Sequence, residues 1–182
     1  MMAKRYFSKL PAGLIALSLC FASLVRADQS FTPAQLRAPF LLHIAHFTQF
    51  PDDDVSGAPV YFCFLEGENH PQADAFRGSP AKDVRQRQIL LVEMDSIEAI
   101  NQQPCHVLFV SQQYENEELF KSLVSLKDKT VSIGESLNFI EQGGMMSIMP
   151  MQSRMRIFFS REAFQSTELK FSSALLKRVN FR

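Results

Sequence analysis

The sequence predicts an α/β fold: a mostly parallel sheet of βαβ units with helices on both faces, a C-terminal antiparallel hairpin and a preceding apolar helix. Short, unbroken apolar runs recur along the chain, as expected for strands that are buried on both faces of a sheet. Helical or loop segments separate these runs, which favours right-handed connections between parallel strands. Near the C-terminus, two alternating runs flank a short polar turn, which is typical of a hairpin.

Residues 1–27 are predicted to be a secretory signal peptide that is cleaved after Ala27. The segment opens with basic residues and no acid, continues with the uncharged run 10–25, and ends with small residues at positions −3 and −1. This run is shorter than the roughly 20 apolar residues of a spanning helix, which argues against an uncleaved anchor. A lipid anchor at Cys20 is a third alternative, but the preceding residues 17–19 place a bulky Leu where such sites carry a small residue.

The mature chain, residues 28–182, is expected to be exported and to fold as a single domain. Its length of about 155 residues suffices for one domain with its own core. It contains 15 Lys and Arg against 19 Asp and Glu, a net charge of −4. Because phosphate binding needs a basic face, this balance argues against nucleic acid as the partner.

The first helix is predicted to begin after Thr32, which acts as N-cap, with Pro33 at the first helical position and Gln35 completing a capping box. One face carries apolar and aromatic residues at helical spacing, namely Leu36, Phe40, His43, Ile44, Phe47 and Phe50. The remaining faces are also largely apolar, with Leu41, Leu42 and Ala45. Such a helix is either central or buried against another chain. Pro39 is expected to kink it or delay its start, and Pro51 to end it.

The middle of the chain alternates between expected strands and expected helices. Strands are predicted at 60–65, 88–92, 106–110 and 130–133. Helical or loop segments are predicted at 72–77, 96–101 and 115–126, of which the last is the clearest amphipathic helix.

The C-terminal third is predicted to form a hairpin and a short helix. The hairpin runs through MMSIM (145–149), a turn at 150–153 and RMRIFFS (154–160), with Met155, Ile157 and Phe159 on one face. The final helix is expected at Ser172–Val179, with Leu175, Leu176 and Val179 facing inward.

Cys63 and Cys105 are the two cysteines of the mature chain, and we expect them to form a disulfide. Each lies at or just before a buried apolar strand, and an exported protein meets an oxidising environment. A catalytic thiolate needs an accessible, electropositive setting, whereas aromatic residues flank Cys63. His106 is a poor base for Cys105 because neighbouring strand residues point to opposite faces. Two buried reduced thiols remain the alternative.

Other candidate sites are weaker. His43 and His46 have a spacing that suits a metal, but no third ligand lies in register, so packed or capping histidines are expected. Met145, Met149 and Met151 lie in a methionine-rich hairpin that has two readings: a Cu(I) site, or methionines that fill a core or an adaptable partner surface. The sequence shows no spacing typical of a catalytic triad, paired catalytic carboxylates or a phosphate-binding loop. We therefore expect no enzymatic activity and no cofactor.

Several segments, in this order, together resemble the YfiR family of bacterial periplasmic proteins. They are FLLHIAHFTQFP (40–51), the strand around Cys63, PCHVLFV (104–110), TVSIGES (130–136), QGGMMSIM (142–149), RMRIFFS (154–160) and LKFSSALLKRV (169–179). The likeness spans about residues 36–180. Phe50 stands where relatives usually have Trp, Ser160 where they often have Asn, and a second cysteine pair of some relatives is missing.

The resemblance implies a periplasmic, dimer-prone α/β domain with no known catalytic activity. Characterised relatives repress a membrane-bound diguanylate cyclase by binding its periplasmic sensor region, which lowers cyclic-di-GMP signalling and thereby affects biofilm formation. We expect the same role here, with an inner-membrane diguanylate cyclase or another envelope sensor protein as the partner and a homodimer as a further assembly. Periplasmic small-molecule or Cu(I) binding by the methionine-rich hairpin is the alternative. The apolar first helix, the hairpin and the last helix are the expected contact surface for the partner. The expected partner-binding residues are Phe40, Leu41, Ile44, Phe47, Leu175 and Leu176.

Overall fold

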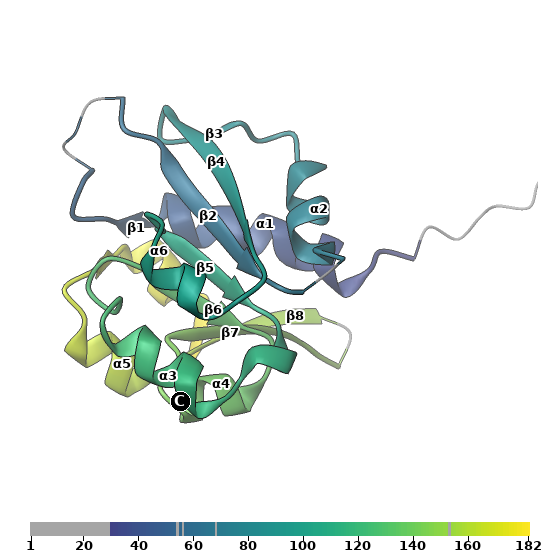
Figure 1. The fold of residues 1–182 in the computed structure, drawn as a ribbon, viewed down its shortest axis with the longest axis vertical. Coiled ribbons are helices and arrows are strands. Elements are labelled where there is room, and N and C mark those ends of the chain that lie inside the picture. The colour runs from purple at the N-terminus through teal and green to yellow at the C-terminus, as the bar shows by residue number, and fades with distance from the viewer. Residues whose placement is uncertain (1–29, 54, 56, 68, 153) are drawn as a thin grey trace, which may run out of the picture. The chain divides into compact units, whose positions relative to one another are not determined.

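The computed structural model describes residues 30–182 except 54, 56, 68 and 153, and an eight-stranded sheet forms the centre of this part of the chain (Figure 1). The predicted signal peptide lies outside the described residues. Eight strands form the main sheet: β2 (Val60–Leu65), β3 (Asp83–Val84), β4 (Arg87–Met94), β5 (Val107–Val110), β6 (Val131–Gly134), β7 (Met146–Met151), β8 (Arg154–Phe159) and β10 (Val179–Phe181). Their order is β10-β8-β7-β6-β5-β2-β4-β3.

The sheet is mostly parallel, as predicted. Strands β7, β6, β5, β2 and β4 run parallel to one another. Strand β8 is antiparallel to β7 and forms the predicted hairpin, β10 is parallel to β8, and β3 is antiparallel to β4. A separate two-stranded sheet pairs β1 (Thr48–Gln49) with β9 (Lys170–Phe171).

Helices cover both faces of the sheet, which confirms the predicted architecture (Figure 1). The helices are α1 (Pro33–His46), α2 (Pro71–Arg77), α3 (Glu117–Val124), α4 (Leu137–Glu141), α5 (Arg161–Ser166) and α6 (Ser173–Leu176). Helices α1, α2 and α6 pack on one face with Phe62 and Phe64, and α3 and α4 pack on the other with Cys63 and Leu65. Because successive strand residues point to opposite faces, β2 supplies both cores, which explains its unbroken apolar sequence.

Helix α1 begins where the sequence predicts but ends earlier. The Thr32–Gln35 capping box and Pro33 at its start are both present. The helix ends at His46 rather than at Pro51, because the chain leaves it to pair Thr48–Gln49 with the distant strand β9. Pro39 lies inside the helix.

The buried face of α1 also differs from the predicted one. Leu36, expected on the buried face, is 42% exposed. The residues that face the sheet are Arg37, Ala38, Leu41, Ile44 and Ala45. The predicted face included Phe47 and Phe50, but both follow the end of the helix, so helical spacing does not place them.

The remaining helices and strands match the predictions in type more often than in length. Strand β2 has the predicted bounds, whereas β4 is longer and α3 shorter than predicted. Strand β7 continues to Met151, so the hairpin turn is shorter than residues 150–153. The predicted helix 172–179 is wrong at its end: α6 stops at Leu176, and Val179 begins strand β10 because its backbone pairs with β8.

Candidate functional site

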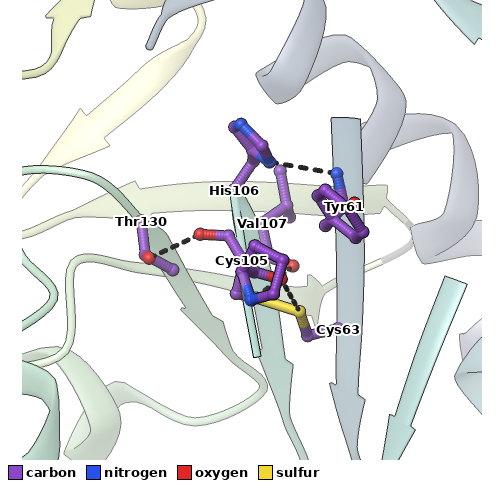
Figure 2. Close-up of a disulfide and its surroundings, with 7 residues drawn as sticks. Tyr61, Cys63, Cys105, His106, Val107 and Thr130 are labelled. Atoms are coloured by element: carbon purple, nitrogen blue, oxygen red, sulfur yellow. Dashed lines mark hydrogen bonds between the residues drawn. A yellow bond between two sulfur atoms is a disulfide. The ribbon is translucent and has the colours of Figure 1, made fainter. Parts of the chain in front are cut away.

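The disulfide between Cys63 and Cys105 confirms the prediction (Figure 2). Cys63 lies within β2 and Cys105 just before the adjacent strand β5, with 6.0 Å between their Cα atoms. Cys63 is fully buried and Cys105 is 9% exposed. The Thr130 hydroxyl donates to the Cys105 carbonyl at 2.6 Å and ties this segment to β6. The bond therefore acts as a crosslink between central strands.

His106 faces away from the disulfide and joins a different set of contacts (Figure 2). The backbone N–H of Tyr61 donates to His106 Nδ1 at 3.0 Å, so this nitrogen carries no proton. His106 Nε2 lies 2.9 Å from Asp52 and donates to that carboxylate. The imidazole is thus a bridge between two backbone segments, and it does not act on Cys105.

Arg87 and two aspartates complete this network at the start of β5. The buried guanidinium of Arg87 forms ion pairs with Asp52 and Asp53 and donates to the carbonyls of Ala58 and Pro59. Burial tends to raise the pKa of Asp52, but hydrogen bonds from His106 and Arg87 and the positive charge of Arg87 hold it below the ordinary value of 3.8. The network holds the loop before β2 against the sheet, which is a structural role.

A second polar network lies near the carboxyl ends of the parallel strands. Arg37 of α1 forms an ion pair with Glu135 at 2.6 Å and donates to the Ile148 carbonyl at 3.0 Å. Glu66, directly after β2, accepts from the backbone N–H groups of Gln72 and Ala73 at the start of α2. Burial raises the pKa of Glu66, against the opposing effect of these two hydrogen bonds. Both charged groups therefore hold helices on the sheet.

A polar pocket of about 630 Å³ opens beside this second network. It lies where the strand order reverses between β2 and β5, the usual ligand position in open α/β sheets. Its lining residues are Glu66, Gly67, Asn69, Pro71, Gln113 and Tyr114. Because the Glu66 carboxylate already caps α2, the pocket offers mainly neutral polar groups.

A smaller groove of about 270 Å³ lies between α1, β8 and the segment after α6, and we call it the α1–β8 groove. It is lined by Pro39, Phe40, His43, Met155, Arg156, Ile157 and Arg178. Ile157 is buried, and Phe40 and Met155 are partly buried, so its floor is apolar. Arg178, which follows α6, is exposed beside it. This groove is the concave part of the surface on which the sequence predicts partner binding.

The six predicted partner-binding residues divide into two groups. Leu41, Ile44 and Leu175 have no exposed surface, and they belong to the core. A partner cannot contact these three side chains while the fold is intact. The other three, Phe40, Phe47 and Leu176, are partly buried and remain accessible. The accessible part of the predicted contact surface is therefore Phe40 in the groove, Phe47 directly after α1 and Leu176 at the end of α6.

The methionines of the hairpin do not converge on one point. Met145 packs in the core on the α1 face, whereas Met149 packs against the core on the α3 face. Met151 is 42% exposed near the end of β7. In the part of the chain that the structure describes, no three His, Cys, Asp or Glu residues form a metal-binding cluster. His43 packs against the ring of Phe47 at 4.5 Å, in keeping with the predicted role of a packed histidine. This arrangement does not favour the copper alternative.

Sequence reasoning missed the residues that act over long distances. Arg37 left one signal, since it is the one cation in an otherwise apolar helical segment, and a buried cation needs a partner. Arg87 left none, because its partners Asp52 and Asp53 reach it only through the fold. No helix within the described ranges is long and apolar enough to cross a membrane.

Comparison with known proteins identifies a family and a fold. The profile of the YfiR/HmsC-like family matches residues 34–178. The chain is also similar to the crystal structure of a conserved domain protein from Vibrio cholerae O1 biovar El Tor, with a TM-score of 0.55 and 9% identity. That likeness covers 84% of this chain and 60% of the Vibrio chain, and at this identity it concerns the fold alone. No individually curated protein matches the sequence.

Proposed function

Because the chain belongs to the YfiR/HmsC-like family, we propose that it is a periplasmic regulator that represses a membrane-bound diguanylate cyclase. In this proposal the protein binds the periplasmic sensor region of the cyclase and lowers cyclic-di-GMP signalling, and with it biofilm formation. The observation that carries the proposal is the family match, which spans nearly all of the predicted mature chain.

Three features of the chain support an exported binding protein. The first 27 residues have the pattern of a cleaved signal peptide. The Cys63–Cys105 disulfide suits an oxidising compartment. The charged groups Arg37, Glu66 and Arg87 are occupied by structural contacts, which leaves them unsuited to acid–base chemistry on a substrate. We therefore propose a binding role without catalysis.

Repression by binding requires that the protein prefer one state of its partner. A ligand shifts a conformational equilibrium only through its differential affinity for the two states. We propose that the surface around the α1–β8 groove binds the inactive state of the sensor region and is the site of this preference. Phe40 is the accessible aromatic residue of that groove.

Deletion of the gene, followed by measurement of cellular cyclic-di-GMP, tests the function. We expect the level to rise on deletion and to fall again when the wild-type gene is restored. Restoration with Phe40→Ser is expected to lower the level less, whereas Val124→Ser, at an apolar residue that is 68% exposed on α3, serves as the control. An unchanged level after deletion contradicts the proposal.

Export and partner binding are tested separately. N-terminal sequencing of the protein from the periplasmic fraction is expected to begin at Asp28. Affinity purification from envelope extracts is expected to recover an inner-membrane protein with a cyclase domain. Recovery of the unprocessed precursor from the cytosol refutes the proposed location.

A further inference from the structure

The last residues of the chain give an otherwise acidic protein a basic edge. Residues 154–182 contain seven Lys and Arg against two Asp and Glu, whereas residues 31–153 contain eight against sixteen. The basic segment supplies β8 and the edge strand β10 of the main sheet. The side chains of these two strands therefore decide where the positive charge is presented.

Strand pairing places three arginines on one face of the sheet. Successive strand residues point to opposite faces, so Arg154, Arg156 and Phe158 share the face of β8 that is turned away from the α1–β8 groove. Strand β10 runs parallel to β8 with Asn180 beside Phe158, so Asn180 lies on the same face. The guanidinium of Arg182 lies over the ring of Phe158, 5.5 Å from its centroid, and thus on this face too. We call these five residues the β8–β10 basic face.

The β8–β10 basic face lies at the margin of the core that α3 and α4 cover. That core extends to Phe158, whereas Arg156, Asn180 and Arg182 are exposed. A hollow of about 490 Å³ lies at this margin, and its lining includes Arg156, Phe158 and Arg182. Met151, at the end of β7, also lines it and is 42% exposed. The hollow therefore combines two accessible cations with apolar side chains.

The arginines of this face differ from the earlier arginines of the chain in their partners. The four arginines between residues 31 and 153 all form ion pairs with carboxylates. Among the described residues, the ion pairs include none with Arg154, Arg156 or Arg182. Guanidinium groups bind carboxylates through paired hydrogen bonds, so unpaired ones on an exposed face favour an anionic partner.

We propose that the β8–β10 basic face binds an acidic segment of the partner protein, with one carboxylate in the hollow between Arg156 and Arg182 and a further one beside Arg154. The inference rests on the proposed function, because it names the kind of partner surface that the regulator recognises. Residues two positions apart on a strand are separated by roughly 7 Å, so Arg154 and Arg156 continue the row of charges beyond the hollow. Such a row matches successive carboxylates of an extended segment better than one small anion.

The net charge of the protein favours a short segment over a membrane surface. The predicted mature chain has a net charge of −4, so an extended anionic surface such as a bilayer also meets its acidic part. A short acidic segment contacts the basic face alone. Because β8 borders the α1–β8 groove with its other face and only β10 lies beyond it, one partner that wraps around this edge can contact both surfaces.

Binding of short peptides to the mature protein tests the chemistry of this face without the natural partner. The probe is a rhodamine-labelled peptide in which Glu and Ser alternate, and its fluorescence anisotropy is measured against protein concentration. A second peptide carries Lys in place of Glu. We expect the Glu peptide to bind more tightly than the Lys peptide and its affinity to fall as salt is added. Equal affinities for the two peptides overturn the inference.

Charge reversal tests whether the β8–β10 basic face is the binding site. The variant is Arg156→Glu/Arg182→Glu, and the matched control is Lys127→Glu/Lys129→Glu, which makes the same change in net charge at exposed residues in the turn after α3. The basic-face variant is expected to weaken binding of the Glu peptide about tenfold or more, and the control to leave it nearly unchanged. Equal effects of the two variants refute the basic face as the site.

Two further measurements distinguish lost binding from lost folding. The basic-face variant is expected to bind the Lys peptide more tightly than the wild type does, because its charge is now complementary to that peptide. Arg156→Lys/Arg182→Lys keeps both charges and is expected to retain most of the affinity for the Glu peptide. Because the substituted side chains are exposed, thermal unfolding of all variants is expected to match the wild type. A folded basic-face variant that still prefers the Glu peptide contradicts the inference.

The same variants separate this inference from the proposed function. If gene deletion raises cyclic-di-GMP but the basic-face variant represses as well as the wild type, the function stands and the inference fails. If the basic-face variant loses peptide binding while deletion leaves cyclic-di-GMP unchanged, binding of acidic segments stands and the proposed function fails. Binding to phosphatidylglycerol vesicles that depends on the basic face, without binding to the Glu peptide, replaces the protein segment with a membrane surface and also overturns the inference.

Discussion

Loss of the Cys63–Cys105 disulfide is expected to lower the stability of the protein without changing its fold. The two cysteines are 42 residues apart in sequence. In the chain-entropy model, closing a loop of this length lowers the conformational entropy of the unfolded chain. This loss of entropy stabilises the folded state by about 4 kcal/mol at room temperature. The native strands need no crosslink to stay adjacent, because the β2–β5 ladder already joins them. The effect should therefore arise mainly in the unfolded state.

Thermal and urea unfolding of the Cys63→Ala/Cys105→Ala variant measure this loss. At about 2–4 °C per kcal/mol for a domain of this size, the unfolding midpoint should fall by about 8–16 °C. The dependence of the unfolding free energy on urea should steepen, because an uncrosslinked unfolded chain exposes more surface. Wild-type protein with the disulfide reduced is the control for the cavities that the alanines leave. If the reduced and oxidised wild-type proteins unfold at the same midpoint, the reasoning is refuted.

Three further predictions concern packing, the buried ion pair and pH. A Cβ atom on Gly144 would lie 2.2 Å from the ring of Phe139 and 2.6 Å from its carbonyl oxygen. Gly144→Ala should therefore lower the free energy of unfolding, measured in urea, by about 1–3 kcal/mol. In the double variant with Phe139→Ala, the loss should be smaller than the sum of the losses of the two single variants. Arg37→Met should lower the free energy of unfolding by about 2 kcal/mol, because it leaves the Glu135 carboxylate and the Ile148 carbonyl without their donor. An unchanged urea midpoint contradicts a stabilising role of Arg37. The pKa of Asp52 is lower in the folded protein than its ordinary value of 3.8. The ionised carboxylate therefore stabilises the fold above pH 3.8, and this stabilisation is lost as the pH falls from 3.8 through the pKa of the folded state. Urea midpoints measured across this pH range should fall less steeply in Asp52→Asn, and parallel curves rule out the assigned contacts.

The parts of the fold that local interactions determine could be predicted from the sequence. The start of α1 was predicted correctly because its N-cap, proline and capping glutamine lie within four residues. The bounds of β2 were also correct, because a strand buried on both faces must be apolar throughout. The end of α1 was predicted incorrectly. Strand β1 follows the helix because it pairs with Lys170–Phe171, more than 100 residues later in the chain.

The candidate site was predicted only in part for the same reason. Because the first helix is apolar nearly all round, Phe40, Leu41 and Ile44 were all predicted to bind the partner, although Leu41 and Ile44 are in the core. An apolar helix has no polar face to show which side meets the sheet, and Arg37, which contacts Glu135, points to the buried side.

The amino-acid sequence alone determined the class of fold, the direction of most strands, the crosslink and the family, because these follow from residue type, spacing and order along the chain. Only the tertiary structure decided which face of α1 is buried, where α1 gives way to strand β1, and that Arg37 pairs with Glu135. These features depend on side chains that are distant in sequence, and packing brings such side chains together in ways that no local pattern records.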